Sequence, residues 1–151
     1  MINAASDICF PDDFDDDELF VGVSGKTGAN GSVYRVVASI AYAYRLGNYD
    51  GTVEDKDIAS LDITGDVGAT LLMAGSADPA AAADVFSSTD DGEGWDGAGK
   101  APSGDGPTYV LMAEDFADSD TAWATTSGTE AAVSYSIDGG DLWNQISLIS
   151  T

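Results

Sequence analysis

The sequence predicts an all-β fold, and two features of the 151-residue chain carry this prediction. Apolar residues occur in short or alternating runs that end at Gly, Asp, Asn or Ser, a pattern typical of β-strands joined by turns. The chain also contains 22 Asp and 18 Gly, and both residue types favour turns. Because 44% of the residues are hydrophobic, the chain has enough apolar material for one domain with a core.

The predicted strands follow one another along the chain, with Gly-rich or Asp-rich segments between them. The first strand lies in the apolar run near Ile8, and another begins at Ile58. The remaining expected strands are Glu18–Ser24, Ser32–Ala38, Ile40–Leu46, Ala69–Gly75, Ala83–Ser87, Thr108–Ala113, Thr121–Ser127, Ala132–Ser136 and Leu142–Ile149. The Ala-rich stretch Asp78–Asp84 is expected to be a loop, because Pro79 and its position between two strands disfavour a helix.

Three segments share one outline, which indicates an internal repeat. Ile8–Gly25, Ile58–Ser76 and Tyr109–Gly128 each contain an apolar strand, a polar connection and a second strand that closes near a serine. The unit is about 50 residues with four strands, a period typical of β-propeller blades. We therefore expect three four-stranded antiparallel blades at about residues 7–50, 57–100 and 107–151, within one propeller segment that covers residues 1–151.

Three blades are fewer than the four to eight that usually close a propeller ring. The outer faces of the first and last blades would then be as apolar as a contact between blades, and such faces mark interaction surfaces. We expect the ring to be closed by a second copy in a six-blade dimer, or by the missing blades of a longer chain. An open head-to-tail fibre is the third possibility.

Two octets, STDDGEGW and SIDGGDLW, repeat the pattern Ser-x-Asp-x-Gly-x-x-Trp. Their pattern residues are Ser88, Asp90, Gly92 and Trp95, and Ser136, Asp138, Gly140 and Trp143. They resemble the Asp-box, or BNR repeat, of β-propellers in extracellular bacterial and archaeal proteins. The resemblance implies a structural hairpin between the third and fourth strands of a blade. It is incomplete, because Gly94 and Leu142 replace the usual Thr or Ser before the Trp, and the first blade reads VVASIAYA at the matching positions.

The residue types also explain why such an octet makes a turn. Asp90 and Asp138 can accept backbone N–H groups across the turn. Gly92 and Gly140 can adopt a positive φ. The Trp residues can add a large apolar surface beneath the hairpin.

The net charge of −22 predicts a surface that repels nucleic acids and anionic lipids, and no apolar run is long enough for membrane insertion. Such a surface attracts cations. The alternating carboxylates Asp13, Asp15 and Asp17 are a candidate calcium site, because calcium prefers oxygen ligands. The competing interpretation is a solvated turn in which Phe14, and Phe116 in the related turn of the third blade, fill the core.

Catalytic chemistry has little support in the sequence. The chain contains no histidine, so the usual general base is absent, and Cys9 is expected to be a small buried hydrophobe rather than a nucleophile. The only arginines are Arg35 and Arg45, too few for the arginine cluster of a sialidase-like site. Three tyrosines near turns of the first blade could stack on sugars, although strand packing also explains them; these are Tyr42, Tyr44 and Tyr49.

These observations predict a non-enzymatic binding or structural module of a secreted or cell-surface protein that associates with itself through blade faces. Calcium is a possible ligand and a glycan is a possible partner. The alternative is a fragment of a glycan-acting propeller, either a lectin or a sialidase-like glycoside hydrolase. The discriminating feature in the sequence is the shortage of arginine.

Overall fold

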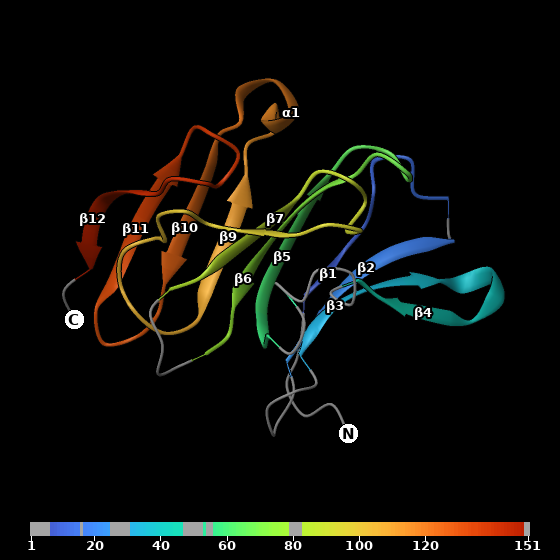
Figure 1. Ribbon diagram of the computed structural model, residues 1–151, viewed down its shortest axis with the longest axis horizontal. Coiled ribbons are helices and arrows are strands. Elements are labelled where there is room, and N and C mark those ends of the chain that lie inside the picture. Colours follow the sequence, from blue (N-terminus) through green and yellow to red (C-terminus); the bar gives the residue numbers. More distant parts are fainter. Residues whose placement is uncertain are drawn as a thin grey trace.

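The prediction of an all-β protein is confirmed by the computed structural model, which contains three four-stranded antiparallel sheets (Figure 1). It describes residues 7–15, 17–24, 31–46, 53, 56–78 and 83–149. In each sheet the strands pair in chain order, so every sheet is an antiparallel meander.

Most strands coincide with the expected apolar runs to within two residues, whereas the two-residue strand Asp96–Gly97 was not expected. The first sheet contains β1 (Ile8–Cys9), β2 (Glu18–Val23), β3 (Ser32–Val37) and β4 (Tyr42–Arg45), with the 3₁₀ turn η1 (Ala38–Ile40) before β4. The second sheet contains β5 (Ile58–Thr64), β6 (Leu71–Ser76), β7 (Val85–Ser88) and β8 (Asp96–Gly97). The third sheet contains β9 (Thr108–Met112), β10 (Ala122–Thr126), β11 (Ala131–Ser136) and β12 (Asn144–Ile149), with the short helix α1 (Phe116–Ser119) between β9 and β10.

Four expected strands begin two residues later than predicted, and two of them, expected over Ala69–Gly75 and Ala83–Ser87, begin at Leu71 and Val85. The strand expected over Ile40–Leu46 starts at Tyr42, because η1 ends in Ala41, whose φ of 50° is left-handed. The strand expected over Leu142–Ile149 starts at Asn144, because the two residues before it complete a hairpin turn. Most of the Ala-rich loop expected over Asp78–Asp84 lies outside the described residues.

The second sheet lies between the other two, and its central strand β6 is buried from both sides (Figure 1). Leu72 and Ala74 belong to a hydrophobic cluster shared with the first sheet. Leu71 and Met73, which alternate with them along β6, pack in a second cluster shared with the third sheet. Alternation along one strand therefore supplies the cores of both sheet–sheet contacts.

The first strands of successive sheets meet along one edge of the molecule, where β5 packs on β1 and β2, and β9 packs on β5 and β6. Two glycines allow this approach. A Cβ added to Gly22 would lie 2.6 Å from Cγ2 of Ile58, and one added to Gly75 would overlap the carbonyl oxygen of Thr108. Only glycine leaves room for the next sheet at these two positions.

Hydrogen bonds reinforce both contacts. The Leu61 N–H donates to Oδ2 of Asp7 (3.1 Å), and the Val110 N–H donates to Oγ of Ser60 (2.9 Å). The Met112 N–H donates to Oδ2 of Asp62 (2.6 Å). Each incoming first strand therefore finds acceptors on the sheet before it, which satisfies backbone groups that its own sheet leaves unpaired.

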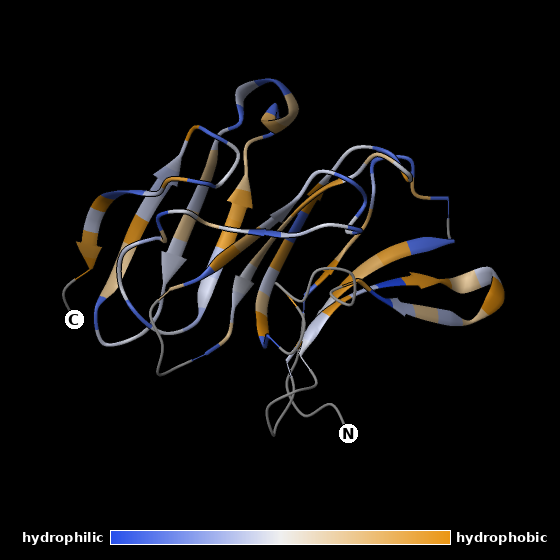
Figure 2. Ribbon diagram, viewed as in Figure 1, coloured by the Kyte–Doolittle hydropathy of each residue, from blue (hydrophilic) through white to orange (hydrophobic). Residues whose placement is uncertain are grey.

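Two sheet faces have no neighbouring sheet within the described chain, one on the first sheet and one on the third. Figure 2 shows hydrophobic residues along strands of both of these sheets. Strand pairing and burial define the residues of each face. The first outer face, on the first sheet, consists of Ile8, Leu19, Val21, Tyr34, Val36 and Ala43, with Arg45 opposite Tyr34 at the edge strand β4. The third outer face, on the third sheet, consists of Tyr109, Leu111, Trp123, Thr125, Val133 and Tyr135. None of these residues is acidic, although the chain carries 27 acidic residues.

Candidate functional site

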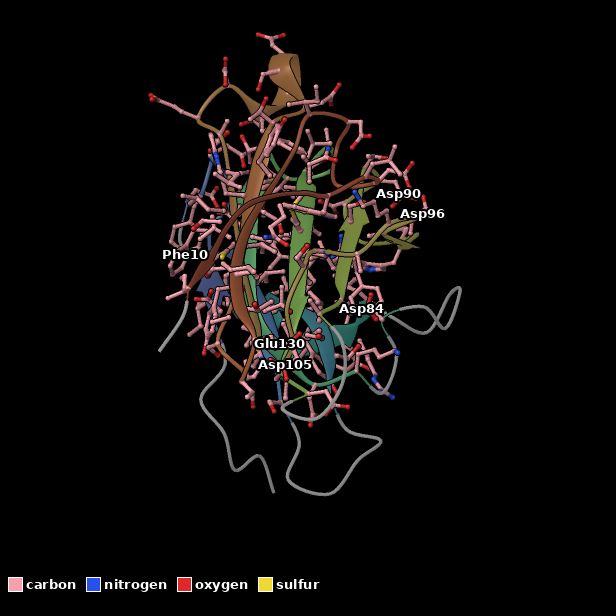
Figure 3. The ribbon with its side chains drawn as sticks, turned by 90° about the vertical axis from the view of Figure 1, so that its left-hand side faces the viewer. Phe10, Asp84, Asp90, Asp96, Asp105 and Glu130 are labelled. Atoms are coloured by element: carbon pink, nitrogen blue, oxygen red, sulfur yellow. The ribbon has the colours of Figure 1, made fainter. Side chains whose placement is uncertain are left out.

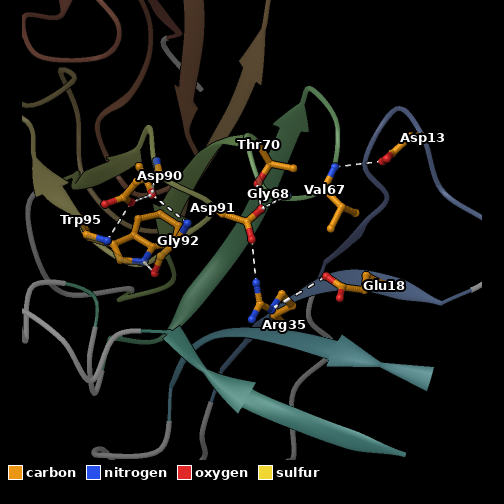
Figure 4. Close-up of polar contacts among 12 residues, drawn as sticks. Asp13, Glu18, Arg35, Val67, Gly68, Thr70, Asp90, Asp91, Gly92 and Trp95 are labelled. Atoms are coloured by element: carbon orange, nitrogen blue, oxygen red, sulfur yellow. Dashed lines mark hydrogen bonds and ion pairs between the residues drawn. The ribbon is translucent and has the colours of Figure 1, made fainter. Parts of the chain in front are cut away.

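Both octets form the hairpin turn between the third and fourth strands of a sheet, and each turn is closed by its own side chains. In the second sheet, Oγ of Ser88 donates to Oδ1 of Asp90 (2.9 Å) and accepts the Gly92 N–H (3.0 Å). The Gly94 N–H donates to the same carboxylate (2.7 Å), and the Trp95 indole donates to the Gly92 carbonyl (3.0 Å) (Figure 4). Gly92 has a φ of 80°, which explains the glycine.

The octet of the third sheet repeats this network bond for bond. Oγ of Ser136 donates to Oδ1 of Asp138 (2.6 Å) and accepts the Gly140 N–H (3.1 Å). The Leu142 N–H donates to Asp138 (3.0 Å), and the Trp143 indole donates to the Gly140 carbonyl (2.8 Å). The bonds from Ser136 and Leu142 lower the pKa of Asp138. Gly94 and Leu142, the residues before each Trp, contribute only their backbone N–H groups to these bonds.

The two Trp side chains connect each hairpin to the preceding sheet. Trp95 is buried in the cluster that also contains Phe20 and Leu46 of the first sheet's segment. Trp143 is fully buried beside Met73 and Val85 of the second sheet. The octets therefore serve the sheet–sheet contacts, and their polar side chains are occupied within the turns.

Asp91, which lies between Asp90 and Gly92 of the octet, joins the hairpin to other parts of the fold, a role that the octet pattern does not indicate. It is buried and adopts a left-handed φ of 62°. Its carboxylate accepts hydrogen bonds from the Thr70 hydroxyl (2.7 Å), the Gly68 N–H (3.2 Å) and Nη1 of Arg35 (2.6 Å) (Figure 4). Because Arg35 lies on β3, this ion pair joins the first sheet to the hairpin of the second.

Arg35 is held on several sides and is not free for an anionic substrate. Besides Asp91, its Nε lies 3.9 Å from Oε2 of Glu18, and its guanidinium lies 5.4 Å from the centre of the Tyr44 ring. Two carboxylates next to one guanidinium neutralise its charge locally. Arg45 donates Nη2 to the Gly31 carbonyl (3.1 Å). The two arginines therefore stabilise the first sheet and do not form a carboxylate-binding cluster.

A hollow of about 330 Å³ lies beside this ion pair at the edge strand β4. The rings of Tyr42 and Tyr44 meet edge to face with centres 4.7 Å apart, and Arg35, Arg45 and Glu93 complete its polar lining. Exposed tyrosines beside polar groups can stack on a sugar ring. Tyr49, the third tyrosine expected to contribute, lies outside the described residues.

The acidic turn of the first sheet uses its carboxylates to bind backbone groups. Asp13 accepts the Val67 N–H (2.9 Å), and Asp17 accepts the Ser39 N–H (2.7 Å), which lowers the pKa of Asp17. Asp15 is exposed and borders the same hollow as these two residues. Within the described ranges, no group of three or more potential ligands is placed to hold a metal ion. The calcium site remains a prediction that this geometry does not support.

The aromatic residues of the two related turns differ in burial. Phe116 is buried in the cluster between the second and third sheets, as the interpretation of a solvated turn expects. Phe14 is only half-buried and packs on Phe10, with ring centres 4.7 Å apart.

Cys9 is half-buried, and its thiol donates to the Leu61 carbonyl (2.8 Å). Burial, together with the charges of Asp7 and Asp62, raises the pKa of Cys9 to about 12. The thiolate is therefore scarce at neutral pH, and the residue acts as a packing group.

Comparison with known proteins assigns no family to this chain. No protein-family model matches the sequence, and no curated protein matches it either. None of the described helices is long and apolar enough to cross a membrane. The functional interpretation consequently depends on the chemistry and geometry of the residues themselves.

Proposed function

We propose that this chain is a non-enzymatic module of the β-propeller type that associates with itself through its outer sheet faces, with a binding or structural role. The observation that carries this proposal is the apolar character of the two outer faces. Neither face contains an acidic residue, although the chain has a net charge of −22. Large apolar faces of this kind usually mark interaction surfaces.

The arrangement of the sheets supports the interpretation as blades. Three antiparallel meanders follow one another, and their first strands meet along one edge. The Asp-box hairpins lie between the third and fourth strands, where the resemblance to the propeller family implies them. An extracellular or cell-surface location follows from the same resemblance, because that family's related repeats are extracellular.

The chemistry of the polar residues favours a non-enzymatic role. The chain has no histidine, and its two arginines bind carboxylate or carbonyl groups of the chain itself. The carboxylates of Asp13, Asp17 and Asp91 accept backbone or side-chain donors within the structure. These carboxylates therefore serve the fold, which supports a non-enzymatic role.

The mass in solution tests the proposed self-association. We expect light scattering during gel filtration to give about twice the chain mass of 15.4 kDa at micromolar concentrations. A chain that remains monomeric up to the millimolar range would contradict the proposal and would favour a fragment that needs the missing blades of a longer chain.

The second candidate is a fragment of a glycan-acting propeller, and the tyrosine-lined hollow at β4 favours it. Binding on a glycan array that is lost in Tyr44→Ala, with unchanged folding, would support a lectin. Hydrolysis of aryl glycosides would support the glycosidase alternative. We expect neither result from the self-associating module.

A further inference from the structure

We infer that two copies of this chain associate by a two-fold contact in which the third outer face of one copy packs against the third outer face of the other. This inference rests on the proposed self-association and specifies its surface. It differs from a six-blade ring, in which the third outer face of each copy would meet the first outer face of its partner.

The third outer face lacks the glycine that both internal contacts use. Strand pairing identifies the equivalent positions, because Gly22 pairs with Val33 and Gly75 pairs with Val85. In the third sheet the residue that pairs with Val133 is Thr125. A β-branched side chain thus occupies the position where the internal contacts leave space for the first strand of the next sheet. The internal contact is not reproduced on this face.

The third outer face also lacks the hydrogen-bond acceptor of the internal contacts. Asp7 and Ser60, which accept N–H groups from the next sheet, lie opposite Gly22 and Gly75. The residue opposite Thr125 is Tyr109. A large aromatic ring therefore stands where the two internal contacts have the short side chain of an aspartate or a serine.

The first outer face is equally unsuited to a contact of the internal kind. The N–H group equivalent to those of Leu61 and Val110 belongs to Ile8, and it already donates to Oδ1 of its neighbour Asp7 (3.0 Å). The first sheet also has Ala43 where the octets of the other sheets have the Trp that packs on the preceding sheet. In a head-to-tail contact, the first and third outer faces would therefore meet without the glycine, the acceptor, the free N–H group and the Trp that the internal contacts use.

The third outer face instead suits a contact with a copy of itself. Pairing aligns Leu111, Trp123 and Tyr135 in one row across three strands, and Tyr109, Thr125 and Val133 in the next row. Large aromatic and aliphatic side chains without charge can interdigitate between two aligned sheets. Two-fold symmetry, the commonest symmetry of homo-oligomers, needs only one such self-complementary surface.

Charge restricts the surfaces at which two copies can meet. Two chains that each carry −22 can approach closely only where neither presents a carboxylate. Acidic residues frame the third outer face at both ends. Asp105 and Glu130 lie at one end, as seen from the third sheet in Figure 3, and Asp115 and Asp118 lie at the other near α1. Because salt screens the repulsion between these rims, we expect the dimer to be stronger at 0.5 M NaCl than at low salt.

A matched pair of variants distinguishes the two arrangements. Leu111 and Ile8 are exposed aliphatic residues on the first strands of the third and first sheets, with 60% and 54% of their surfaces accessible. We expect Leu111→Gln to convert the dimer to a monomer, with at least a tenfold weaker association in sedimentation equilibrium. We expect Ile8→Gln to retain the dimer. Circular dichroism melts check folding, and Trp123→Gln provides a second variant of the same face.

Each outcome separates the inference from the proposed function. If both Leu111→Gln and Ile8→Gln are monomeric, copies meet head to tail, so the inference is wrong while self-association stands. If Leu111→Gln and Trp123→Gln remain dimeric, another surface is used, and the inference is again wrong. A wild-type chain that is monomeric at every concentration and salt overturns both.

Discussion

The hairpins of the second and third sheets contain the same octet hydrogen bonds, and the difference that matters most between them is the residue at their centre. The residue after the shared Ser-x-Asp is left-handed in both hairpins, and in the hairpin of the second sheet it is Asp91, with a φ of 62°. In the third hairpin it is Gly139, with a φ of 72°. Glycine adopts this conformation without strain, whereas a residue with a Cβ does so at a free-energy cost.

The difference shows how a repeated turn acquires a second role. The left-handed conformation of Asp91 is tolerated because its carboxylate accepts hydrogen bonds from Thr70, Gly68 and Arg35. Arg35 belongs to the first sheet. In the second sheet the position equivalent to Arg35 is Ser87, an uncharged residue that pairs with Met73 as Arg35 pairs with Phe20. The turn itself is set by the octet, and the residue at its variable position decides how the hairpin is attached to its neighbour.

The largest expected effect is the loss of the tryptophan that both hairpins share. We expect Trp143→Ala and Trp95→Ala each to lower the free energy of unfolding by about 3–5 kcal/mol, because a large cavity is left in a packed cluster. Chemical denaturation of monomeric protein measures this. Ile137→Ala is the control, since Ile137 lies in the same hairpin as Trp143 with 64% of its surface exposed and its truncation leaves no cavity. A loss below about 1 kcal/mol for Trp143→Ala would contradict the packing described above.

The next largest effect is expected from the ion pair between Arg35 and Asp91, which only the hairpin of the second sheet contains. We expect Arg35→Met to lower the free energy of unfolding by about 2 kcal/mol, since it leaves Asp91 buried without its cation while Arg35 itself is partly exposed. The double variant Arg35→Met/Asp91→Gly should be more stable than this single variant, because the unpaired charge and the left-handed strain both disappear. A double-mutant cycle measures the coupling. Additive losses would show that the pair contributes no net interaction.

A smaller effect is expected from exchanging the two hairpins at their variable position. Gly139→Asp places a side chain at a φ of 72° without an arginine to pair with it, and we expect a loss of about 1 kcal/mol. The melting temperature compared with that of wild type measures the change. Gly139→Asn is the control, because it introduces similar strain without adding charge. If Gly139→Asp were as stable as wild type, the strain argument for Asp91 would fail.

The pH dependence of stability distinguishes a hairpin carboxylate from a buried one. Because the pKa of Asp138 is lowered, its contribution is present above about pH 4 and is lost as the pH falls through the folded-state pKa. We expect the melting temperatures of wild type and Asp138→Asn to converge below pH 4. Burial raises the pKa of Asp62, so its ionised form is disfavoured in the folded protein. We therefore expect the opposite trend for Asp62→Asn. As the pH falls, the melting temperature of wild type should rise relative to that of this variant.

The smallest expected effect is that of removing divalent cations. The acidic turn and both hairpins hold their carboxylates with N–H and O–H donors. We therefore expect EDTA to leave the melting temperature unchanged at constant ionic strength, with added calcium as the comparison. A reproducible decrease that calcium reverses would restore the prediction of a site at Asp13, Asp15 and Asp17.

The parts that could be predicted from sequence depend on residues close together in the chain. Most strand positions follow from alternation and turn residues, because both signals act within a few residues. In each octet, the hydrogen bonds of the Ser hydroxyl and the Asp carboxylate join groups at most four residues apart. The residue types of the octet therefore indicate the geometry of the turn. The 3₁₀ turn before β4 was missed because VVASIAYA contains no glycine or proline to mark it.

The sequence by itself determined that this protein consists of β-strands in three repeated units, with two self-contained turns. Only the tertiary structure decided which of those turns is tied to another sheet, since Asp91 and Arg35 are 56 positions apart. The tertiary structure also decided what the acidic run binds. Its alternate spacing predicts carboxylates that converge on one point. Instead, Asp13 and Asp17 accept hydrogen bonds from N–H groups 54 and 22 positions away. The physical reason is that a local pattern specifies which side chains share a face. Which groups that face contacts depends on which distant segments of the chain pack against it.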